Sequence, residues 1–528
     1  MGLFQISIFL WASTLQSFKM NHDSISHIRY LFMFERVTAF IPLKIGLISI
    51  FLLTMLSIVG CYMLQADIIE TFYFGRDFVL FYPKHPPVAF WFAGAVLAVF
   101  PSKLLLLVSP VITYTGYLLV SYLGWKLSLY YFKDIRIKAL VPVSICLALF
   151  TKQIWFTPDF FALVLSSLML YFFYLSLKSD HLFYWLIFAL CALLFFFSKY
   201  QAVVSFIALF ITMIMTKLGR SRFRSKKFWF IVGLGFIVLL PYVVIMFNEN
   251  ANSLNYAHDT AKKFKDFSFV EALLTPLSVA FLPVALALIF FSKIKILLGF
   301  KAYLNELKIG SFDAVFLLIN SIGFLFIWIL FCAFFNHAMQ TRFTIQNIIP
   351  FTILFFLFFQ SAILAIKEKP LKLTLSILII TTLLAFTVKI IKQNRWNQLE
   401  QREQAYLELK KVIPQPLDYI VSKGRSYDTD TFYMAFKEKP FVRIIDYSSE
   451  QIISDEINNK NVILLWKQVE TPAWAKQFIA KNPGFIMGEP ILVKGEKEKI
   501  LGIAVKHKNF SIGYAYKTTA DVIHKKLK

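Results

Sequence analysis

The segment Gln65–Pro87, QADIIETFYFGRDFVLFYPKHPP, is a charged and aromatic stretch between two strongly apolar parts of the chain. Apart from tyrosines, its ionisable side chains are three carboxylates, two cations and one histidine: Asp67, Glu70, Asp77, Arg76, Lys84 and His85. If residues 67–77 are helical, the carboxylates fall within about a quarter of a turn, because each helical residue advances about 100°. The pair Pro86-Pro87 suits a helix that begins at Val88. The segment therefore predicts a polar site beside a membrane.

The composition is that of an integral membrane protein. Hydrophobic residues make up 58% of the 528 residues and charged residues only 16%, which excludes an ordinary soluble protein. The net charge of +24 comes from lysines and arginines in loops and in the C-terminal region. The positive-inside rule and attraction to anionic lipid explain this charge without a nucleic-acid partner. The cysteines lie in apolar runs without metal-ligand spacing, and we expect them only to pack: Cys61, Cys146, Cys191 and Cys332.

Basic segments between the apolar runs set the predicted topology. Four of them are placed on the cytoplasmic side: Phe132–Lys138, Lys217–Lys227, Lys293–Lys308 and Lys367–Lys372. The apolar runs then alternate consistently from residue 138 onward, and we expect about 11 to 13 membrane helices, the first of them Ile41–Leu64, with the N-terminus inside. This alternation requires residues 88–127 to cross the membrane only once, although they contain two apolar runs. One of these runs, Val88–Pro101, is therefore expected to be interfacial or re-entrant.

The character of the chain changes at about residue 394. A polar segment of helical pattern is followed by short runs rich in Val and Ile, such as Val462–Trp466, which predict strands. The predicted fold is therefore mostly α, with a polytopic membrane domain over residues 1–393 and a small α/β soluble domain over residues 394–528. The second domain has no Gly-rich phosphate loop, no Cys/His ligand spacing and no nucleophile elbow.

The residues of Gln65–Pro87 suggest acid–base chemistry next to a phosphate site. Asp67 follows the first span, where a carboxylate is suited to accept a proton from a hydroxyl group, or else it only caps a helix. Glu70, one turn later, is suited to perturb Asp67 by like-charge proximity or to bind a divalent cation with it; a solvated helix face is the alternative. Arg76, Lys84 and His85 are suited to a phosphate group, although Arg76 has acids nearby and Lys84 can reach lipid headgroups.

The same residues carry a resemblance to a family. The segment is similar to the first external loop of polytopic glycosyltransferases that use polyprenyl-phosphate sugars, the group of protein O-mannosyltransferases and aminoarabinose (lipid A) transferases. The matching positions are Asp67, Glu70, Phe74-Gly75-Arg76-Asp77 and Lys84-His85-Pro86-Pro87-Val88. Many members have adjacent Asp and Glu, whereas here Ile68 follows Asp67, which resembles a bacterial subgroup. The resemblance implies the GT-C fold, Asp67 as the base and His85 as a contact of the lipid phosphate.

Residues farther along the chain complete the expected site. The resemblance implies a second phosphate contact at Lys199, in the element Lys199-Tyr200, and a functional Asp159. If the resemblance is set aside, Asp159 only starts a helix after Thr157-Pro158. Lys199 and Tyr200 then only anchor a span at the membrane interface. His258 lies in a predicted external loop that is suited to cover a substrate. Arg342, at a predicted membrane edge on the same side, is a further candidate for the donor phosphate.

Two functions from different classes fit these features. The first is a glycosyltransferase that moves a sugar from a polyprenyl-phosphate carrier to an acceptor at the outer face of the cytoplasmic membrane. The acceptor is lipid A or lipopolysaccharide, another glycan, or a protein. The sequence identifies no cofactor, and a divalent cation is an open alternative. The alternative is a transporter or flippase of lipid-linked substrates. Transporters usually carry ionisable residues within their spans, but here the strongly polar groups deep in the apolar runs are few, among them Asn320 and Gln360.

Overall fold

The computed structural model describes a part of the chain that is mostly helical, with strands confined to the C-terminal region. The described residues are 66–76, 78–82, 85–100, 104–152, 156–248, 293–334, 344–393, 405–413, 416–422, 443–446, 460–466, 469–482, 484–493, 497–500, 503–506 and 510–517. Among them, four helices are long and apolar enough to cross a membrane: Pro158–Ser179, Lys226–Met246, Phe312–Phe334 and Ile345–Leu364. The prediction of a polytopic, mostly α membrane protein is confirmed. The total of about 11 to 13 spans stays a prediction, because Ile41–Leu64 and other predicted spans lie outside the described residues.

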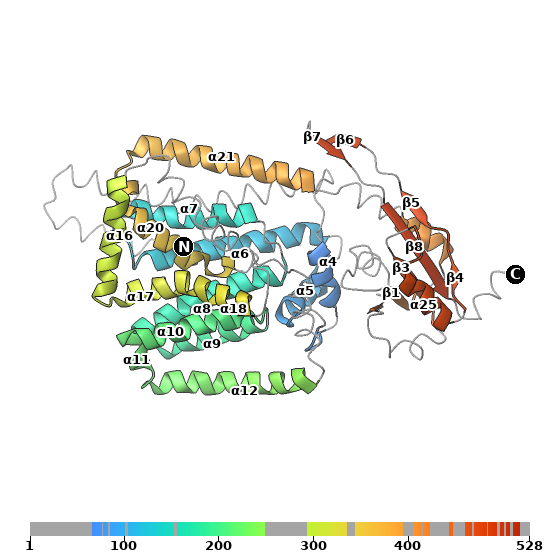
Figure 1. The fold of residues 1–528 in the computed structure, drawn as a ribbon, viewed down its shortest axis with the longest axis horizontal. Coiled ribbons are helices and arrows are strands. Elements are labelled where there is room, and N and C mark those ends of the chain that lie inside the picture. Colours follow the sequence, from blue (N-terminus) through green and yellow to red (C-terminus); the bar gives the residue numbers. More distant parts are fainter. Residues whose placement is uncertain are drawn as a thin grey trace.

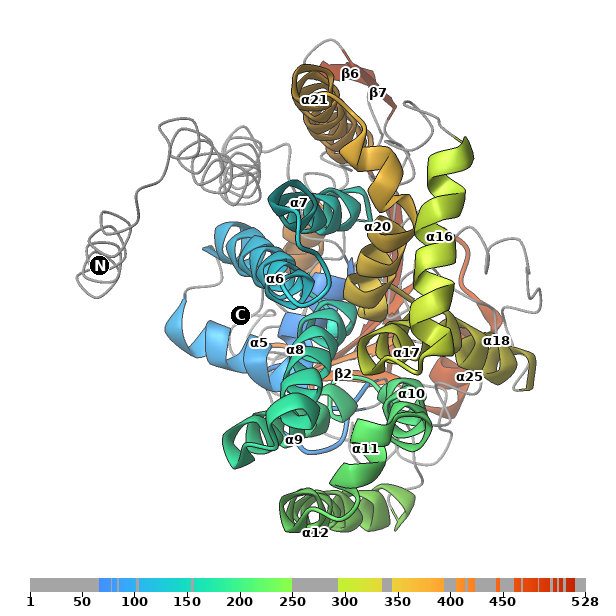
Figure 2. The ribbon, with the colours of Figure 1, turned by 90° about the vertical axis from the view of Figure 1, so that its left-hand side faces the viewer.

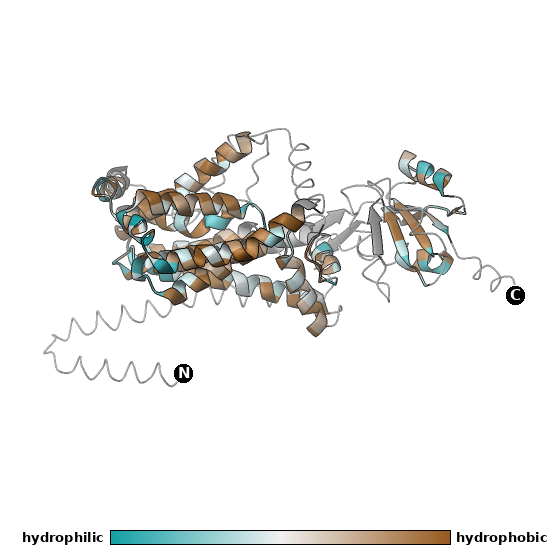
Figure 3. Cartoon of the chain, turned by 90° about the horizontal axis from the view of Figure 1, so that it is seen from below, coloured by the Kyte–Doolittle hydropathy of each residue, from teal (hydrophilic) through white to brown (hydrophobic). Residues whose placement is uncertain are grey.

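Most of the long helices run side by side along one axis (Figure 1). They are α6 (Leu105–Ser128), α7 (Ile135–Lys152), α8 (Pro158–Ser179), α9 (Leu182–Phe196), α10 (Ala202–Met215), α12 (Lys226–Asn248), α17 (Phe312–Leu318), α18 (Phe324–Phe334), α20 (Ile348–Leu364) and α21 (Glu368–Gln393). Apolar residues cover long stretches of these helices, and hydrophilic residues gather at one end of the bundle (Figure 3). Large aromatic side chains such as Trp185, Trp328 and Tyr174 are fully buried between them.

A π-helical turn, η2 (Ile319–Gly323), interrupts the apolar helix between α17 and α18. Its Asn320 is 1% exposed and donates from Nδ2 to the hydroxyl of Thr212 on α10 at 3.0 Å. Asn347, at the end of the 3₁₀ turn η3 (Ile345–Asn347), donates to the carbonyl of Asn320 at 2.7 Å. Such turns often mark functional positions, but here these contacts fasten three helices to one another.

One end of the bundle, which we call the α11 end, collects the basic segments. It contains the short helix α11 (Lys217–Arg222) and α16 (Lys293–Lys308), which lies across the bundle (Figures 1 and 2). The Tyr131 hydroxyl donates to the Asp313 carbonyl at 3.4 Å, and the Tyr303 hydroxyl of α16 donates to the Ala314 carbonyl at 2.8 Å. The last half of α20, which leads into α21, packs on α16. The four segments predicted to share one side therefore meet at one end.

The opposite end, which we call the α4 end, carries α4 (Ala66–Phe74) and α5 (Val88–Val99). Helix α5 begins at Val88 as the Pro-Pro pair predicts. Figure 2 shows α5 from the side, whereas α6 and α8 are seen nearly end-on, so α5 lies across the bundle as expected for an interfacial segment. The helix considered above for residues 67–77 is shorter in the structure, because α4 ends at Phe74 and the chain turns at Gly75 and Arg76.

The C-terminal strands form a mixed sheet beside the α4 end (Figure 1). Its order is β2-β1-β3-β8-β4, in which β2, β1 and β3 are parallel and β8 is antiparallel to both β3 and β4. The strands are β1 (Tyr419–Ser422), β2 (Arg443–Asp446), β3 (Val462–Trp466), β4 (Ile486–Met487) and β8 (Phe510–Lys517), with β5 (Ile491–Val493) also paired to β8 and a separate hairpin of β6 (Lys497–Ile500) and β7 (Ile503–Lys506). Helix α25 (Ala473–Lys481) contributes Phe478 to the core of this α/β region.

Candidate active site

Helix α4 brings the first predicted acids to the α4 end. Asp67 lies in the first turn of the helix, where only its backbone is described, and Glu70 is half-buried one turn later. Ile68 and Phe72 on the same helix are completely buried, and the Phe72 ring stacks on Phe156 with centroids 5.0 Å apart. Apolar packing against the residues that precede α8 therefore fixes α4 in place.

The turn after α4 depends on two glycines. A Cβ on Gly75 would lie 2.6 Å from the backbone nitrogen of Gly94, and one on Gly94 would lie 2.1 Å from the carbonyl oxygen of Gly75. The backbones of α4 and α5 thus approach each other where no side chain fits. This contact explains the glycine of the predicted Gly75-Arg76 element. The half-buried Arg76 places its guanidinium over the Tyr73 ring, 4.4 Å from the centroid.

Tyr73 also connects α4 to the C-terminal region. It is half-buried and packs against a hydrophobic cluster there. The buried members of that cluster are Ala405, Tyr406, Leu409, Ile413, Leu417, Ile420, Ile463, Leu465, Ile512 and Tyr514. The helix that carries Asp67 and Glu70 is therefore in contact with both the membrane helices and the C-terminal region.

The His-Pro-Pro element is fastened to a distant part of the chain through main-chain atoms. The N–H of Val88 donates to the carbonyl of Phe197, at 2.9 Å. His85 is half-buried, and its ring lies at an interplanar angle of 30° to that of Phe90, with centroids 6.5 Å apart. Because Phe197 is two residues before Lys199, this hydrogen bond brings the segment of His85 next to the segment of Lys199.

Asp159 and Lys199 form an ion pair at the same end of the bundle. The Lys199 side chain is 7% exposed and that of Asp159 is 13% exposed. Asp159 lies in the first turn of α8, after Pro158, where the helix dipole favours a negative charge. The burial of Lys199 against Asp159 favours a site role over an interfacial anchor, because a headgroup anchor keeps its ammonium in the interface. Each charge is stabilised by the other, so a phosphate would have to share Lys199 with Asp159.

An aromatic cluster surrounds the next residue, Tyr200. Its hydroxyl lies 3.2 Å from the hydroxyl of Tyr242 on α12. Tyr242 stacks on Phe81, with centroids 4.9 Å apart, and contacts Phe197 edge-on at 4.8 Å. The sequence reasoning missed Tyr242, although a tyrosine directly after Pro241 in a long apolar run was a visible signal.

The α4 end therefore brings together most of the predicted site residues. The segments that meet there carry Asp67, Glu70, Arg76, His85, Asp159, Lys199 and Tyr200. Lys84, His258 and Arg342 lie outside the described residues. No group of three or more His, Cys, Asp or Glu side chains suited to a metal occurs within the described ranges. Acids and cations from separate segments thus share one half-buried, aromatic environment.

Part of the chain matches a known protein family. Residues 84–245 match the model of the dolichyl-phosphate-mannose-protein mannosyltransferase family. The matched region begins just before His85 and includes Asp159, Lys199 and Tyr242. The match confirms the resemblance found in the sequence and indicates a membrane glycosyltransferase. No curated protein matches the chain.

Proposed function

We propose that the protein transfers a sugar from a polyprenyl-phosphate carrier to an acceptor in the cell envelope, at the outer face of the cytoplasmic membrane. The acceptor is lipid A or lipopolysaccharide, another glycan, or a protein. The observation that carries this proposal is the main-chain hydrogen bond from Val88 to Phe197. It holds the segment of His85 beside the buried pair of Asp159 and Lys199, so that cations distant in sequence converge on one place for a phosphate.

The orientation in the membrane follows from the charges at the two ends of the bundle. Lysines and arginines crowd the α11 end, as in Lys217–Lys227, and basic segments of membrane proteins face the cytoplasm. The α4 end, with the candidate site and the C-terminal sheet next to it (Figure 1), then faces outward. Lipid-linked sugars are donors suited to that side, where nucleotide sugars are absent.

The reaction we propose is a single displacement with inversion at the anomeric carbon. An acceptor hydroxyl oxygen forms the new bond to that carbon, and its proton passes to the Asp67 carboxylate. The bond between the anomeric carbon and the phosphate oxygen breaks, and its electron pair leaves with the polyprenyl phosphate. Cations of the His85 and Lys199 segments stabilise the charge that develops on the departing oxygen. If the acceptor is itself a phosphate, no base is needed and Asp67 only orients it.

The alternative, transport of a lipid-linked substrate, has less support in the described helices. Asn320 is a deep polar residue, and its amide nitrogen donates to Thr212 on α10, which joins two helices, and to the Phe316 carbonyl of its own helix. In the four candidate spans, Asp, Glu, Lys and Arg occur only near helix ends, as with Asp159, Lys178 and Asp313. A transport path usually needs such groups at depth.

The test uses the purified full-length protein in lipid nanodiscs with a polyprenyl-phosphate sugar as donor. We expect Asp67→Asn to abolish transfer while the protein still inserts and accumulates. Asp180→Asn, at the α11 end, is the matched carboxylate control and should retain transfer per folded molecule. Full activity of Asp67→Asn would remove Asp67 from the mechanism. Mass spectrometry of envelope glycolipids and glycans from a deletion strain identifies the sugar and the acceptor.

A further inference from the structure

Helix α12 lies at the edge of the bundle (Figure 1), and one of its residues enters the candidate site. In its apolar window only 17% of residues are buried, and Ile237 on its outer face is 72% exposed. The described buried residues of this helix are Ile231, Tyr242 and Met246. Tyr242 is 4% exposed and is the one of the three that carries a hydrogen-bonding group. Among its described buried residues, this mostly exposed helix thus contributes one hydrogen-bonding side chain to the interior.

The partners of Tyr242 come from both phosphate-binding segments. Phe81, four residues before His85, stacks on it with an interplanar angle of 22°. Phe197, whose carbonyl accepts the Val88 N–H, contacts it from the other segment. The hydroxyl of Tyr200, adjacent to Lys199, lies at hydrogen-bonding distance from its own. One side chain therefore contacts the residues that flank both His85 and Lys199.

We propose that Tyr242 is a positioning residue that fixes the His85 and Lys199 segments around the phosphate of the lipid donor. The inference rests on the proposed function. Its stacked ring sets the position of Phe81, and its hydroxyl sets the position of Tyr200. The Val88–Phe197 hydrogen bond already joins the two segments, and Tyr242 on α12 adds a second support that limits the freedom of the residues around Lys199. Loss of this support costs affinity for the phosphate, since the loop must then be ordered on binding.

A structural role alone predicts a different result from a positioning role. Tyr303 provides the comparison, because it is 6% exposed and its hydroxyl also makes one hydrogen bond, to Ala314, but at the α11 end. Tyr242→Phe and Tyr303→Phe each remove one buried hydroxyl contact and leave the ring. If burial and stability are all that matter, the two variants should behave alike in every assay.

The experiment measures donor KM and kcat, together with the Kd of polyprenyl phosphate, for full-length protein in nanodiscs. We expect Tyr242→Phe to raise both the donor KM and the Kd of polyprenyl phosphate by roughly fivefold to tenfold, because one hydrogen bond is lost. The change in kcat should be smaller. Tyr242→Ala should raise them further, and Tyr303→Phe should leave them unchanged. A Tyr242→Phe variant that binds polyprenyl phosphate as the wild type does, or a Tyr303→Phe variant that weakens equally, overturns the inference.

Hydrogen exchange separates this inference from the proposed function. Amides of residues 197–203 should exchange faster in Tyr242→Phe than in the wild type. In Tyr303→Phe their exchange rates should equal those of the wild type. If the wild-type protein neither binds polyprenyl phosphate nor transfers sugar, the proposed function fails, and the exchange result still decides whether Tyr242 holds the loop. Unchanged exchange at residues 197–203 in Tyr242→Phe contradicts the positioning role, whichever way the binding experiment turns out.

Discussion

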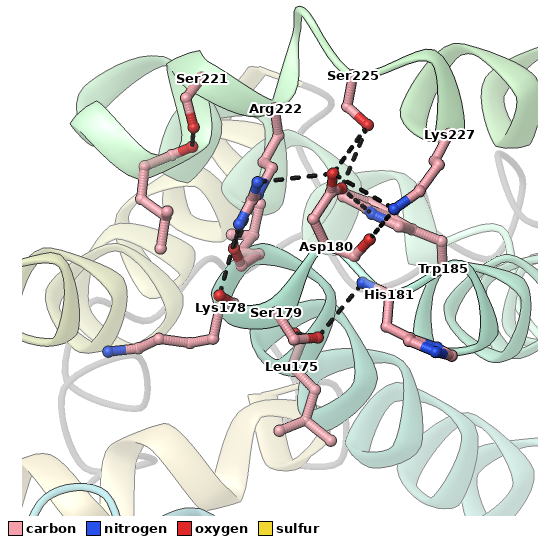
Figure 4. Close-up of polar contacts among 12 residues, drawn as sticks. Leu175, Lys178, Ser179, Asp180, His181, Trp185, Ser221, Arg222, Ser225 and Lys227 are labelled. Carbon is pink, nitrogen blue, oxygen red and sulfur yellow. Dashed lines mark hydrogen bonds and ion pairs between the residues drawn. The ribbon is translucent and has the colours of Figure 1, made fainter.

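The two ends of helix α8 each carry an aspartate beside a cation, but the surroundings differ. At the α4 end, Asp159 and Lys199 form a buried pair among aromatic rings. At the α11 end, Asp180 is 24% exposed and contacts Arg222 at 3.7 Å and Lys227 at 3.8 Å (Figure 4). The same pair of charges is weakly screened in one place and partly solvated in the other.

The Asp180 cluster is a structural joint. Asp180 ends α8 in the left-handed conformation, with a φ of 51°. Its carboxylate accepts hydrogen bonds from Trp185 Nε1 at 3.0 Å and from Ser225 Oγ at 3.2 Å. The cluster therefore joins the turn between α8 and α9 to the start of α12. An ion pair alone therefore does not identify a candidate active site. The buried pair at the α4 end differs because separate segments of the chain meet around it.

The largest effect is expected from breaking the buried pair. Lys199→Met removes the cation from Asp159 and should cost about 3 kcal/mol of stability, since loss of one partner strands a buried charge. Transfer should fall by roughly 100-fold or more, because the proposed phosphate contact disappears as well. The double variant Asp159→Asn with Lys199→Met should regain stability but not activity. Thermal unfolding and a transfer assay measure the two effects, and a single variant as stable as the wild type would contradict the role of the pair.

The next largest effect concerns the glycines that let α4 approach α5. Gly94→Ala places a methyl group 2.1 Å from the Gly75 carbonyl and 2.8 Å from the Phe78 ring. The two helices must separate. We expect transfer to fall by about tenfold, because even a small displacement of a catalytic group lowers the rate. Gly233→Ala on α12, where no atom lies within 4 Å, is the matched control and should be neutral. Equal activity of both variants would show that the position of α4 is unimportant.

A smaller effect, on stability alone, is expected at the α11 end. Asp180→Asn removes the charge that Arg222 and Lys227 contact and should lower the free energy of unfolding by about 1 to 2 kcal/mol. Transfer per folded molecule should stay unchanged. Denaturation and single-turnover rates measured on the same sample check both statements. A drop in the rate without a drop in stability would mean that the two ends are coupled.

The smallest effect is expected for an exposed pair at the same end. Lys178 lies 2.9 Å from Asp313, and the two side chains are 36% and 31% exposed. Lys178→Met should therefore change stability by less than about 1 kcal/mol. Measuring unfolding at low and high salt tests this, because a screened surface pair should lose its small contribution as salt rises. A change as large as that of Lys199→Met would erase the contrast between the two ends.

Local patterns predicted much of the fold. The Pro-Pro pair located the start of α5 at Val88, and the distribution of lysine and arginine placed four basic segments at one end. The helix considered over residues 67–77 in fact ends at Phe74, and residue spacing alone does not show the close contact of Gly75 with Gly94 that accompanies the turn. The spacing of residues around Gly75 cannot show that the chain must turn there to contact Gly94, which is nineteen residues later in the sequence.

The candidate site was predictable only in part, and for a physical reason. Motif residues such as His85 and Lys199 are recognisable because their chemistry suits a phosphate. Tyr242 and Phe156 act through packing with partners distant in sequence, as in the contact of Tyr200 with Tyr242. An aromatic residue in an apolar run has the same appearance whether it faces lipid or the interior. Only the folded chain separates Tyr242, which is buried, from Phe236, which is 66% exposed.

The hydrogen bond between Val88 and Phe197 is made by main-chain atoms alone. Such a bond is indifferent to side-chain identity, so either position can drift among most amino acids over evolution while the link persists. Proline at position 88 is the exception, since it lacks the N–H. Divergent descendants of this chain are therefore free to exchange many side chains around these two segments while inheriting an unchanged distance between the two backbones.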